Sequence, residues 1–476
     1  MGHPGSPINS ANSYWRTVNS KNLKFQYKKT KLLLVCSHGS FVLKFVVMFS
    51  KIKRLVPEPV KKVYHALQAA AGALIFWFPS RRVKVIGVTG TDGKTTTVYL
   101  IHHILSEVGK KASMISTVEA KIGKETIDTG LHVTTPEPFK VQKLLRKIAN
   151  SKSEYAVLEA TSHGLAQERV AFVRFFAGVV TNITHEHLDY HKTYENYLAS
   201  KAKILRGVKL RILNADDAPY EILKEKGSGQ LVSYGIKNEA DFMAKNINFF
   251  EKGSEFEVCF HNRQRNSQKV KVKANLPGEY NVYNLLAAFA ITVSLGVEAE
   301  RVGEAIASFK GVVGRMQYLD EGQDFNCVVD FAHTPASLEA ALKTLRVGAK
   351  GKIIAVFGCA GGRDFEKRPM MGKIATELAD CAIFTAEDPR SEDINRILEQ
   401  MAGGALSVGG IPNRTFWKIA DRAEAINTAI GSLAQKGDIV VLFGKGHEKS
   451  MNISGVEYPW SDEEAARNAL KVRLRK

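Results

Sequence analysis

The segment from Lys84 to Thr97 constrains the fold of this chain most, because it reads as a buried strand, a glycine-rich loop and the start of a helix. Its sequence is Lys-Val-Ile-Gly-Val-Thr-Gly-Thr-Asp-Gly-Lys-Thr-Thr-Thr. The glycines let backbone N–H groups turn toward an oxyanion, the lysine reaches terminal phosphates, and the next hydroxyl is placed for Mg²⁺. The sequence therefore predicts a nucleoside triphosphate as the ligand.

The loop is the shortened Gly-Thr-x-Gly-Lys-Thr form, since Val88 stands where a strict Walker A loop has glycine. The simpler alternative is a glycine turn with a lysine lying along the surface. An apolar strand before the loop and a helix-like pattern at 99–108 favour the nucleotide interpretation. The predicted nucleotide-binding residues of the loop are Gly90, Thr91, Asp92, Gly93, Lys94, Thr95 and Thr96.

Length and composition indicate a globular protein of two or three domains, with 476 residues of which 45% are hydrophobic. The five cysteines form no Cys-x-x-Cys pair, which favours a reducing compartment and a cytoplasmic protein. The net charge is +19, but residues 1–87 hold 15 Lys or Arg and one acid, which leaves +5 for the rest. The body has no basic stripe with interleaved aromatics, so no nucleic-acid partner is predicted.

The basic N-terminal region divides into two segments. Residues 1–47 are a poorly patterned leader, and Met48 is an alternative start to Met1. Residues 48–83 are basic and helix-like, and they include an uncharged stretch at 63–78 framed by Lys61, Lys62, Arg81 and Arg82. This stretch is short for a bilayer span. We expect residues 51–82 either to make a peripheral contact with an anionic membrane or to pack against the next domain.

Beyond the loop, predicted strands alternate with helical segments, which is typical of a mostly parallel sheet covered on both faces. The strands span 112–116, 155–159 and 176–181, and the helical segments include 137–150 and 194–205. Glu159-Ala-Thr-Ser-His-Gly-Leu follows one strand, and Thr181-Asn-Ile-Thr-His-Glu-His-Leu-Asp-Tyr-His follows the next. Ligands bind at such carboxyl ends of strands. We interpret the histidine-rich run as a metal and phosphate site, with a solvated loop as the alternative.

Three motifs, Gly-Thr-x-Gly-Lys-Thr-Thr, Glu-x-x-Ser-His and Thr-Asn-x-x-x-x-His-Leu-Asp, resemble in this order the ATP-dependent Mur ligases. Further motifs extend the resemblance over about residues 84–476. They are Thr-Thr-Pro at 134–136, Gly-Glu-Tyr-Asn-Val-Tyr-Asn-Leu-Leu-Ala-Ala at 278–288, Gly-Arg-Met at 314–316, Val-Asp-Phe-Ala-His-Thr-Pro at 329–335, Phe-Gly-Cys at 357–359 and Gly-Lys-Gly-His-Glu at 444–448. The set is similar to the MurE branch, which adds the third stem-peptide residue to UDP-N-acetylmuramoyl-L-alanyl-D-glutamate in peptidoglycan synthesis.

The resemblance implies an α/β fold with two ligase domains. The expected central domain, residues 84–313, is a Mur ligase-like P-loop domain with a mostly parallel sheet. The expected C-terminal domain, residues 314–476, is Rossmann-like and binds the incoming amino acid, with a hinge near 312–314. A UDP-binding domain is expected at the N-terminus of such ligases, and its pattern is not found here. A monomer is expected.

The chemistry implied by the resemblance is amide formation through an acyl phosphate made with ATP, and phosphoryl transfer of this kind requires cations above all. Lys94 would neutralise the transferring phosphate. Thr95 and Glu159 would hold one Mg²⁺, and His187 a second. The carbamylated lysine of the family matches Lys201, 14 residues after His187, with Lys203 as a weaker candidate and an unmodified lysine as the alternative. The predicted catalytic residues are therefore Lys94, Glu159, His187 and Lys201.

The resemblance also assigns the remaining ligand contacts by position. The nucleotide contacts outside the loop are Asn281, Asn284, Arg315, Asp330 and His333. Those for the acceptor, UDP-muramoyl dipeptide, are Thr134, Thr135, Thr161, Ser162, Gln167 and Arg169. Those for the amino acid are Arg363, Glu387, Asp388, Pro389, Arg390, Gly444 and Glu448.

The Glu387-Asp-Pro-Arg390 run resembles the signature of diaminopimelate-adding enzymes. A guanidinium can fork onto the second carboxylate of meso-diaminopimelate, which lysine lacks, so this amino acid is the predicted substrate. The alternatives are a related ligase acting on a lipid-linked, cyanophycin-type or folate-type acceptor, and a non-catalytic nucleotide-binding protein.

Overall fold

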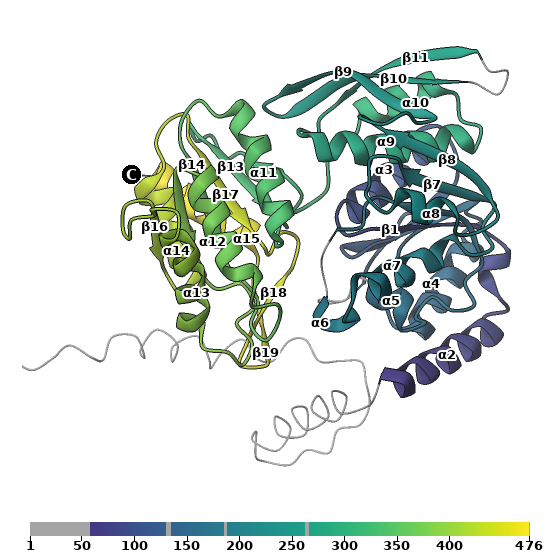
Figure 1. Ribbon diagram of the computed structural model, residues 1–476, viewed down its shortest axis with the longest axis horizontal. Helices are drawn as coiled ribbons and strands as arrows, with labels where there is room; N and C mark the ends of the chain where they lie inside the picture. The colour runs from purple at the N-terminus through teal and green to yellow at the C-terminus, as the bar shows by residue number, and fades with distance from the viewer. Residues whose placement is uncertain (1–57, 130–134, 185–187, 262–265, 476) are drawn as a thin grey trace, which may run out of the picture. The chain divides into compact units, whose positions relative to one another are not determined.

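The computed structural model describes residues 58–129, 135–184, 188–261 and 266–475 (Figure 1). The predicted leader at 1–47, the start of the basic segment at 48–57, Thr134 and His187 lie outside the described residues. Among the described residues, no helix combines the length and apolar character needed to cross a bilayer.

The central domain is organised by one sheet of eleven described strands, in the order β11-β10-β9-β8-β7-β6-β1-β5-β2-β3-β4. Its strands are β1 (Lys84–Thr89), β2 (Ala112–Ile115), β3 (Glu119–Ile122), β4 (Glu125–Asp128), β5 (Tyr155–Glu159), β6 (Phe175–Val180), β7 (Leu210–Asn214), β8 (Gln230–Gly235), β9 (Phe242–Phe250), β10 (Gly253–His261) and β11 (Ser267–Ala274). Strands β2, β5, β1, β6, β7, β8 and β9 pair in parallel, whereas β2-β3-β4 and β9-β10-β11 pair antiparallel. The mostly parallel α/β fold predicted from the sequence is confirmed.

Helices cover both faces of the parallel strands, which explains why β5 and β7 are buried at every position. The central helices are α2 (Glu58–Ile75), α3 (Lys94–Glu107), α4 (Pro138–Asn150), α5 (Ser162–Ala166), α6 (Leu188–His191), α7 (Tyr194–Ala202), α8 (Tyr220–Lys224), α9 (Glu279–Ser294) and α10 (Ala299–Ala307). Alternate residues of β1 point to opposite faces. Ile86 and Val88 join a core with α3 and α9, and Val85 joins another with α4 and α7.

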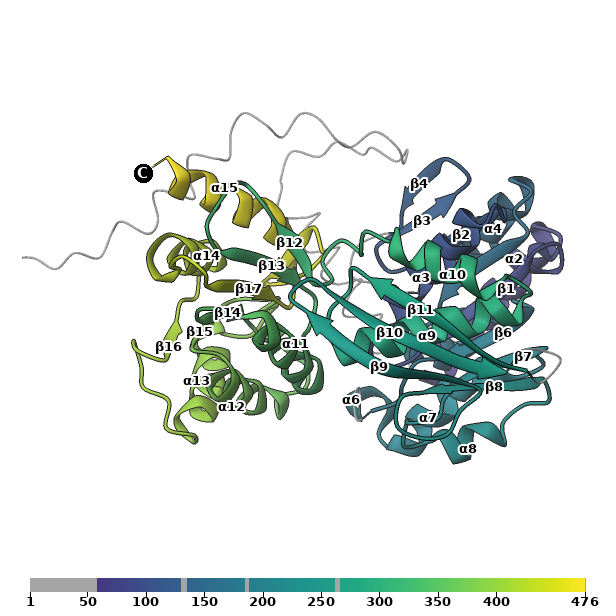
Figure 2. The same cartoon turned by 90° about the horizontal axis from the view of Figure 1, so that it is seen from above.

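The C-terminal domain has its own six-stranded sheet, in the order β12-β13-β17-β14-β15-β16, with only β12 antiparallel (Figures 1 and 2). Its strands are β12 (Gln317–Leu319), β13 (Asn326–Asp330), β14 (Ile353–Phe357), β15 (Cys381–Phe384), β16 (Phe416–Lys418) and β17 (Ile439–Phe443). The helices are α11 (Pro335–Gly348), α12 (Lys367–Leu378), α13 (Ile394–Leu406), α14 (Arg422–Thr428) and α15 (Asp462–Leu474), and β18 (Ser450–Ile453) pairs with β19 (Val456–Pro459). One core contains α11, α12 and α13, and a second contains α14 and α15.

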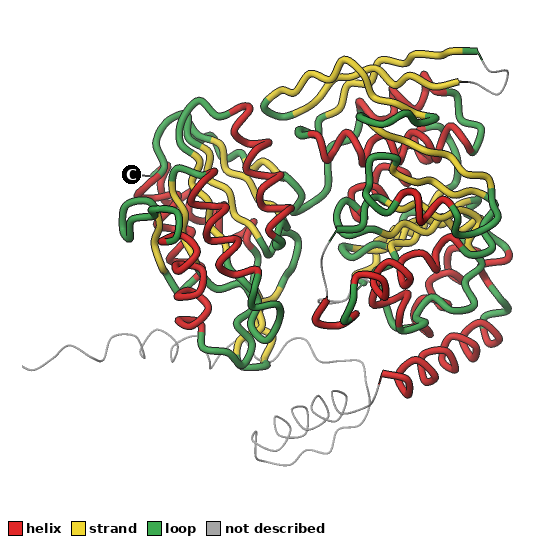
Figure 3. Tube along the Cα trace, in the orientation of Figure 1, coloured by secondary structure: helices red, strands yellow, loops and turns green. Residues whose placement is uncertain are grey.

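The strands at 112–116, 155–159 and 176–181 and the helix at 137–150 appear within one residue of their predicted bounds, whereas the helix expected at 99–108 begins earlier, at Lys94. The segment 194–205 is the helix α7 followed by a 3-10 turn at 203–205. The antiparallel additions β3–β4 and β9–β11 were not predicted. Figure 3 shows the long strands of the latter at one side of the domain, with helices packed against them.

Candidate active site

The predicted phosphate loop connects the carboxyl end of β1 to the start of α3, and both of its glycines are required by close approaches. A Cβ on Gly90 would lie 1.8 Å from Oγ1 of Thr181. Gly93 has φ +81°, and a Cβ there would lie 2.1 Å from Oδ1 of Asn284. A larger residue at either position would displace the loop, so the glycines are fixed by packing as well as by conformation.

The loop is held by the residues that follow β6. The backbone N–H of Thr91 donates to the carbonyl of Asn182 at 2.8 Å, and that of Asp92 donates to the Asn182 side chain at 2.9 Å. The Thr181 hydroxyl donates to the carbonyl of Asp92 at 2.6 Å. Thr181 and Asn182 were not among the predicted site residues, although their position directly after a strand was the available signal.

Lys94 lies folded over the loop. Its Nζ donates to the carbonyls of Gly90 at 3.0 Å and Thr91 at 2.7 Å. The ammonium is therefore on the same loop whose backbone N–H groups would cradle a phosphate, and a bound anion would compete for it with two neutral carbonyls. Thr96, also in the predicted set, is buried in the first turn of α3.

Thr95 and Glu159 meet at the carboxyl ends of β1 and β5. The Thr95 hydroxyl donates to the carboxylate oxygens of Glu159 at 3.0 and 3.1 Å, and the N–H of Thr117 donates to Oε2 at 2.9 Å. Glu159 is 1% exposed. A hydroxyl and a carboxylate are the hard oxygen donors that suit Mg²⁺, so this pair fits the predicted metal. Within the described ranges, no three His, Cys, Asp or Glu residues form a metal cluster.

Lys201 is 1% exposed, and its Nζ lies 4.5 Å from the ring centroid of Tyr197. The Tyr197 hydroxyl is 2.9 Å from Oγ1 of Thr91, which connects the surroundings of this lysine to the phosphate loop. Burial raises the pKa of nearby Asp217 to about 6, although the Ile183 N–H and the Lys201 charge act in the opposite direction. Burial of an ammonium carries a desolvation cost.

Lys203, the weaker candidate for the modified lysine, lies in a different environment. Its Nζ forms an ion pair with Glu168 and donates to the carbonyl of Leu165 at 3.0 Å. This lysine is partly exposed and already has an anionic partner. The structure therefore places the two lysines in different surroundings, and the modification of Lys201 stays a prediction.

Five of the six predicted acceptor contacts come together around the turn after β5. The hydroxyls of Thr135 and Thr161 lie 3.0 Å apart, and Arg169 donates to the Thr135 carbonyl at 2.9 Å and to Oε1 of Gln167 at 3.0 Å. Ser162 begins α5, for which Thr161 is the N-cap. Helix α2 reaches the same turn, since Nδ1 of His65 lies 3.1 Å from the Gln167 carbonyl oxygen.

Arg315 and Asp330 lie where the chain enters the C-terminal domain. Both carboxylate oxygens of Asp330 accept backbone N–H groups, from Met316 at 2.7 Å and Ala332 at 2.8 Å. The Arg315 guanidinium lies 4.2 Å from the ring centroid of Phe331, and its Nη2 is 3.5 Å from the Thr95 hydroxyl. Burial lowers the pKa of Arg315, while Asp330 and Glu159 oppose this shift.

The other three predicted nucleotide contacts are held by protein groups. The Asn281 amide donates to the Pro277 carbonyl at 2.8 Å, and that of Asn284 donates to Asn281 at 3.2 Å. The ring Nδ1 of His333 lies 3.0 Å from the Phe331 carbonyl oxygen. The Asn284 side chain packs against Gly93 and so shapes the loop. Asn281 in turn holds Asn284 by accepting its hydrogen bond.

The predicted amino-acid contacts lie on loops after β14, β15 and β17. Lys445, which the sequence analysis did not select, joins two of these loops because its Nζ donates to Asp388 at 2.9 Å and to Glu448 at 2.5 Å. Burial lowers the pKa of Lys445, but the two carboxylates outweigh it and the pKa is raised. The signal for Lys445 was its place inside the Gly-Lys-Gly-His-Glu motif.

The remaining members of this set differ in exposure. Arg390 has φ +54°, and its N–H donates to the Asn452 carbonyl at 2.9 Å. Pro389 is packed against Gly361, whose Cβ would lie 2.0 Å from the proline carbonyl. Arg363 is exposed on the neighbouring turn. A Cβ on Gly444 would lie 3.2 Å from Oε2 of Glu387, so these two residues are in contact.

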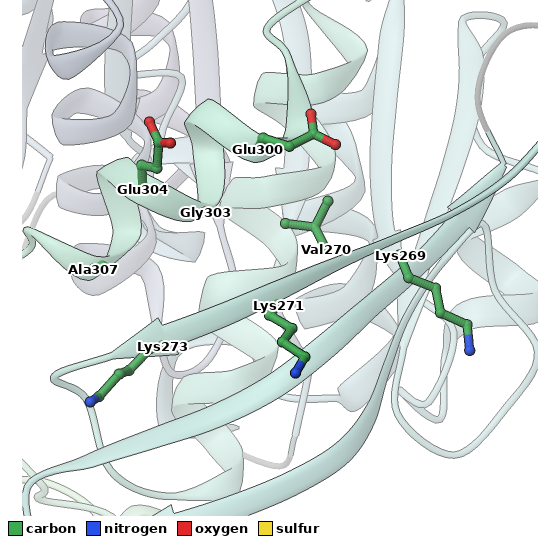
Figure 4. Close-up of a pocket in the computed structure, with 8 residues that line it drawn as sticks. All are labelled: Lys269, Val270, Lys271, Lys273, Glu300, Gly303, Glu304 and Ala307. Atoms are coloured by element: carbon green, nitrogen blue, oxygen red, sulfur yellow. The ribbon is translucent and has the colours of Figure 1, made fainter.

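A shallow groove of about 380 Å³ lies between β11 and α10 (Figure 4). It is lined by Lys269, Val270, Lys271, Lys273, Glu300, Gly303, Glu304 and Ala307. None of these residues belongs to the predicted site. The lysines lie on an edge strand, where their charge prevents pairing with a strand of another chain. This structural role accounts for the charged lining of the groove.

Comparison with known proteins agrees with this architecture. Residues 88–292 match the Mur ligase middle domain, and residues 314–446 match the Mur ligase glutamate ligase domain. The chain is 36% identical over 431 residues to UDP-N-acetylmuramoyl-L-alanyl-D-glutamate--2,6-diaminopimelate ligase 1 of Clostridium acetobutylicum, covering 90% of this chain and 86% of that one. It is 39% identical over 404 residues to the ligase of the same activity name from Geobacillus thermodenitrificans, covering 83% and 80%.

Solved structures give the same result. A structure of a UDP-N-acetylmuramoyl-L-alanyl-D-glutamate--2,6-diaminopimelate ligase superposes with a TM-score of 0.57 at 32% identity, covering 82% of this chain and 79% of the other. MurF from Thermotoga maritima in complex with ADP shares the fold, with a TM-score of 0.61 at 18% identity and coverage of 87% and 84%. The fold and the phosphate loop define a P-loop protein with two α/β domains. The chain belongs to the Mur ligase family.

Proposed function

We propose that this protein is a MurE-type ligase that uses ATP to join meso-diaminopimelate to the D-glutamate carboxylate of UDP-N-acetylmuramoyl-L-Ala-D-Glu, in peptidoglycan synthesis. The observation that carries the proposal is the meeting of Lys94, Thr95 and Glu159 at the phosphate loop. The matching relatives bear the name of this activity. Their similarity does not favour a cyanophycin-type or folate-type acceptor, a lipid-linked acceptor or a non-catalytic role.

The chain's own residues supply most of what the reaction needs. When bound, Mg²⁺ would neutralise charge on the phosphate oxygens, and Thr95 and Glu159 would hold it. Lys94 would leave the loop carbonyls to stabilise the transferring phosphate. The turn carrying Thr135, Thr161 and Arg169 would orient the acceptor. The acceptor carboxylate would attack the γ-phosphorus of ATP, and ADP would leave. The amine would then displace phosphate from the resulting acyl phosphate to form the amide, with release of one proton.

The experiment that tests the proposal measures phosphate release and amide formation by the full chain. Release should require ATP, Mg²⁺, the UDP-linked dipeptide and the amino acid together. Replacing Lys94 with Ala removes the ammonium that would neutralise the transferring phosphate, so the rate should fall by a factor on the order of a thousand. The exposed Lys110 provides the control, since Lys110→Ala should leave the rate unchanged. Near-normal ligation by Lys94→Ala would contradict the proposal.

We further propose that Lys201 is carbamylated by CO₂ in the active enzyme. Its burial beside the phosphate loop supports this, because a carbamate would replace a poorly solvated cation by an anion able to serve Mg²⁺ through oxygen. We propose two bound Mg²⁺, with His187 for the second. We also propose a monomer. Light scattering on the purified chain tests the last point.

The face of α2 turned away from the central domain supports a peripheral membrane contact. His65, Ala69 and Ala73 are buried on the side that packs against α4. The opposite side exposes large apolar residues at helical spacing, and the turn after the helix exposes Trp77. These exposed residues are Val60, Val63, Tyr64, Leu67, Leu74, Ile75 and Trp77. An apolar helix face of this size on a water-soluble body marks an interaction surface.

Charge favours an anionic lipid surface as the partner of this face. Residues 59–82 contain Lys61, Lys62, Arg81 and Arg82 and no acid, and helix α4 beside them adds four more cations and no acid. We propose that the α2 face binds an anionic membrane and, through His65, holds the acceptor turn near it. Each cation near the surface is worth about 1 kcal/mol and is screened by salt.

Flotation with vesicles tests the membrane contact. The full chain should float with vesicles of phosphatidylglycerol and phosphatidylcholine at low salt, and less at high salt or with phosphatidylcholine alone. Leu67→Glu should abolish flotation, whereas Ile222→Glu, at another exposed apolar position on α8, should not. Absence of flotation at low salt, or a stable complex with another protein in its place, would reject the proposal.

A further inference from the structure

Arg422 and Asp462 form a buried ion pair that the proposed chemistry does not use. Arg422 is 2% exposed and begins α14, and Asp462 is fully buried and begins α15. Nε donates to Oδ1 at 2.7 Å and Nη2 to Oδ2 at 2.6 Å, and the indole of Trp460 donates to Oδ1 at 2.8 Å. Burying two charges carries a large desolvation cost, so a pair of this kind calls for a specific reason.

The guanidinium also holds two backbone carbonyls. Nη1 donates to the carbonyl of Ala386 at 3.0 Å, and Nη2 donates to that of Phe443 at 2.8 Å. Ala386 directly precedes the 387–390 loop, and Phe443 directly precedes the 444–448 loop. These loops follow β15 and β17, which are separated in the sheet by β14. No strand pairing joins them directly, so Arg422 braces two loops that the sheet leaves apart.

A second link, made by the side chain of Lys445, joins the same two loops. Lys445 donates to Asp388 and to Glu448, and the N–H of Asn452 donates to the same oxygen of Asp388 at 3.0 Å. Lys445 joins side chains, whereas Arg422 fixes the backbone from which those side chains start. Arg390 and Glu448, the predicted contacts for the second carboxylate and for the distal ammonium of the amino acid, stand on these two loops.

We propose that Arg422 is a positioning residue for the incoming amino acid, acting through the spacing of the 387–390 and 444–448 loops. The inference rests on the proposed function, since it takes these loops as the amino-acid site. A diamino acid held by its second carboxylate on one loop and its distal ammonium on the other requires a fixed distance between the two loops, and loss of that distance weakens binding without touching the nucleotide loop. Arg422 itself is buried and does not touch the ligand.

The test compares Michaelis constants for the three substrates. Arg422→Lys keeps the charge but cannot span Asp462 and both carbonyls, so the Michaelis constant for diaminopimelate should rise about tenfold or more, while those for ATP and the UDP-linked dipeptide stay within about twofold. The preference for diaminopimelate over lysine should fall as well. Asp462→Asn, which leaves the guanidinium in place, should show a smaller change in the same direction.

Arg473 provides a matched control. It donates to the carbonyls of Ile430 at 2.5 Å and Ala434 at 2.7 Å in the same domain, away from any predicted ligand loop. Arg473→Lys should lower the melting temperature without changing any Michaelis constant. If the Arg422 and Asp462 variants only lose stability in the same way, the positioning role is wrong. A wild type that rejects diaminopimelate overturns the proposed function instead, and the comparison is then made with the amino acid that it accepts.

Discussion

The Thr95 hydroxyl donates a hydrogen bond to the Glu159 carboxylate, with 3.0 Å between Oγ1 and Oε1, across 64 positions of sequence. Thr95 stands in the first turn of α3, and Glu159 is the last residue of β5, the strand beside β1. The parallel pairing of β1 and β5 brings both carboxyl ends to one edge of the sheet. A hydroxyl and an acid from separate motifs thereby share one oxygen-rich position beside the phosphate loop.

Removing the negative charge of Glu159 should slow catalysis strongly without destabilising the fold. Glu159→Gln can still accept from Thr95, but it is a weaker ligand for Mg²⁺, so kcat should fall by about 10²–10³. Melting temperature and phosphate release are the measurements. Glu154→Gln, at an exposed ion pair with Lys84, is the control and should leave the melting temperature and phosphate release unchanged. A Glu159→Gln enzyme with ordinary turnover would show that this carboxylate does not serve the metal.

Lys201 and Lys203 should respond differently to the same substitution. Lys201→Ala removes the proposed carbamate, so activity should be low and partly restored by small carboxylic acids such as formate or acetate, which supply the missing oxygens. Lys203→Ala breaks the ion pair with Glu168 and should show no such rescue. Activity assays across a range of carboxylate concentrations make the comparison. Full activity of Lys201→Ala without any additive would refute the modification.

Arg390 should discriminate between diaminopimelate and lysine. Loss of a charged, bidentate contact to a buried carboxylate costs about 2 to 4 kcal/mol, so Arg390→Ala should raise the Michaelis constant for diaminopimelate far more than that for ATP. Steady-state kinetics with each amino acid measure the effect. Arg414→Ala, at an exposed position of the same domain, is the control. The signature interpretation fails if the wild type already uses lysine as well as diaminopimelate.

Stability of the C-terminal domain should depend on pH through Glu392. Its hydrogen bonds from Arg368, at 2.8 Å to each oxygen, lower its pKa from 4.5 to about 2, because they favour the ionised carboxylate. Its contribution is present above the unfolded-state pKa and is lost as pH falls from about 4.5 to about 2.

The variant Glu392→Gln should therefore cost about 3 kcal/mol of unfolding free energy at pH 7, and progressively less below pH ~4.5. Urea unfolding followed by tryptophan fluorescence, to which Trp417 and Trp460 contribute, measures this. Glu399→Gln, at an exposed pair with Lys418, serves as the control and should change stability by less than about 1 kcal/mol. A cost that stays constant from pH 7 to pH 3 would contradict the assigned cause.

The nucleotide loop and the class of the fold follow from local sequence patterns. Glycines at 90 and 93 between an apolar strand and a helix, and strands alternating with helices, are patterns among near neighbours, and such patterns directly reflect backbone freedom and burial. The mostly parallel sheet and the membership of the Mur ligase family were accordingly predicted correctly. The roles of the individual site residues stay predictions until the variants are measured.

Contacts between groups far apart in the sequence became known from the three-dimensional fold. Local patterns gave no sign that Arg422 would reach both Ala386 and Phe443, or that Lys445 would join Asp388 to Glu448. They also left open whether α2 packs on the body, whereas the structure buries one of its faces and exposes the other. Contacts of this kind depend on the order of strands in the sheet and on the packing of helices upon it, and residues close together in sequence do not encode that order locally.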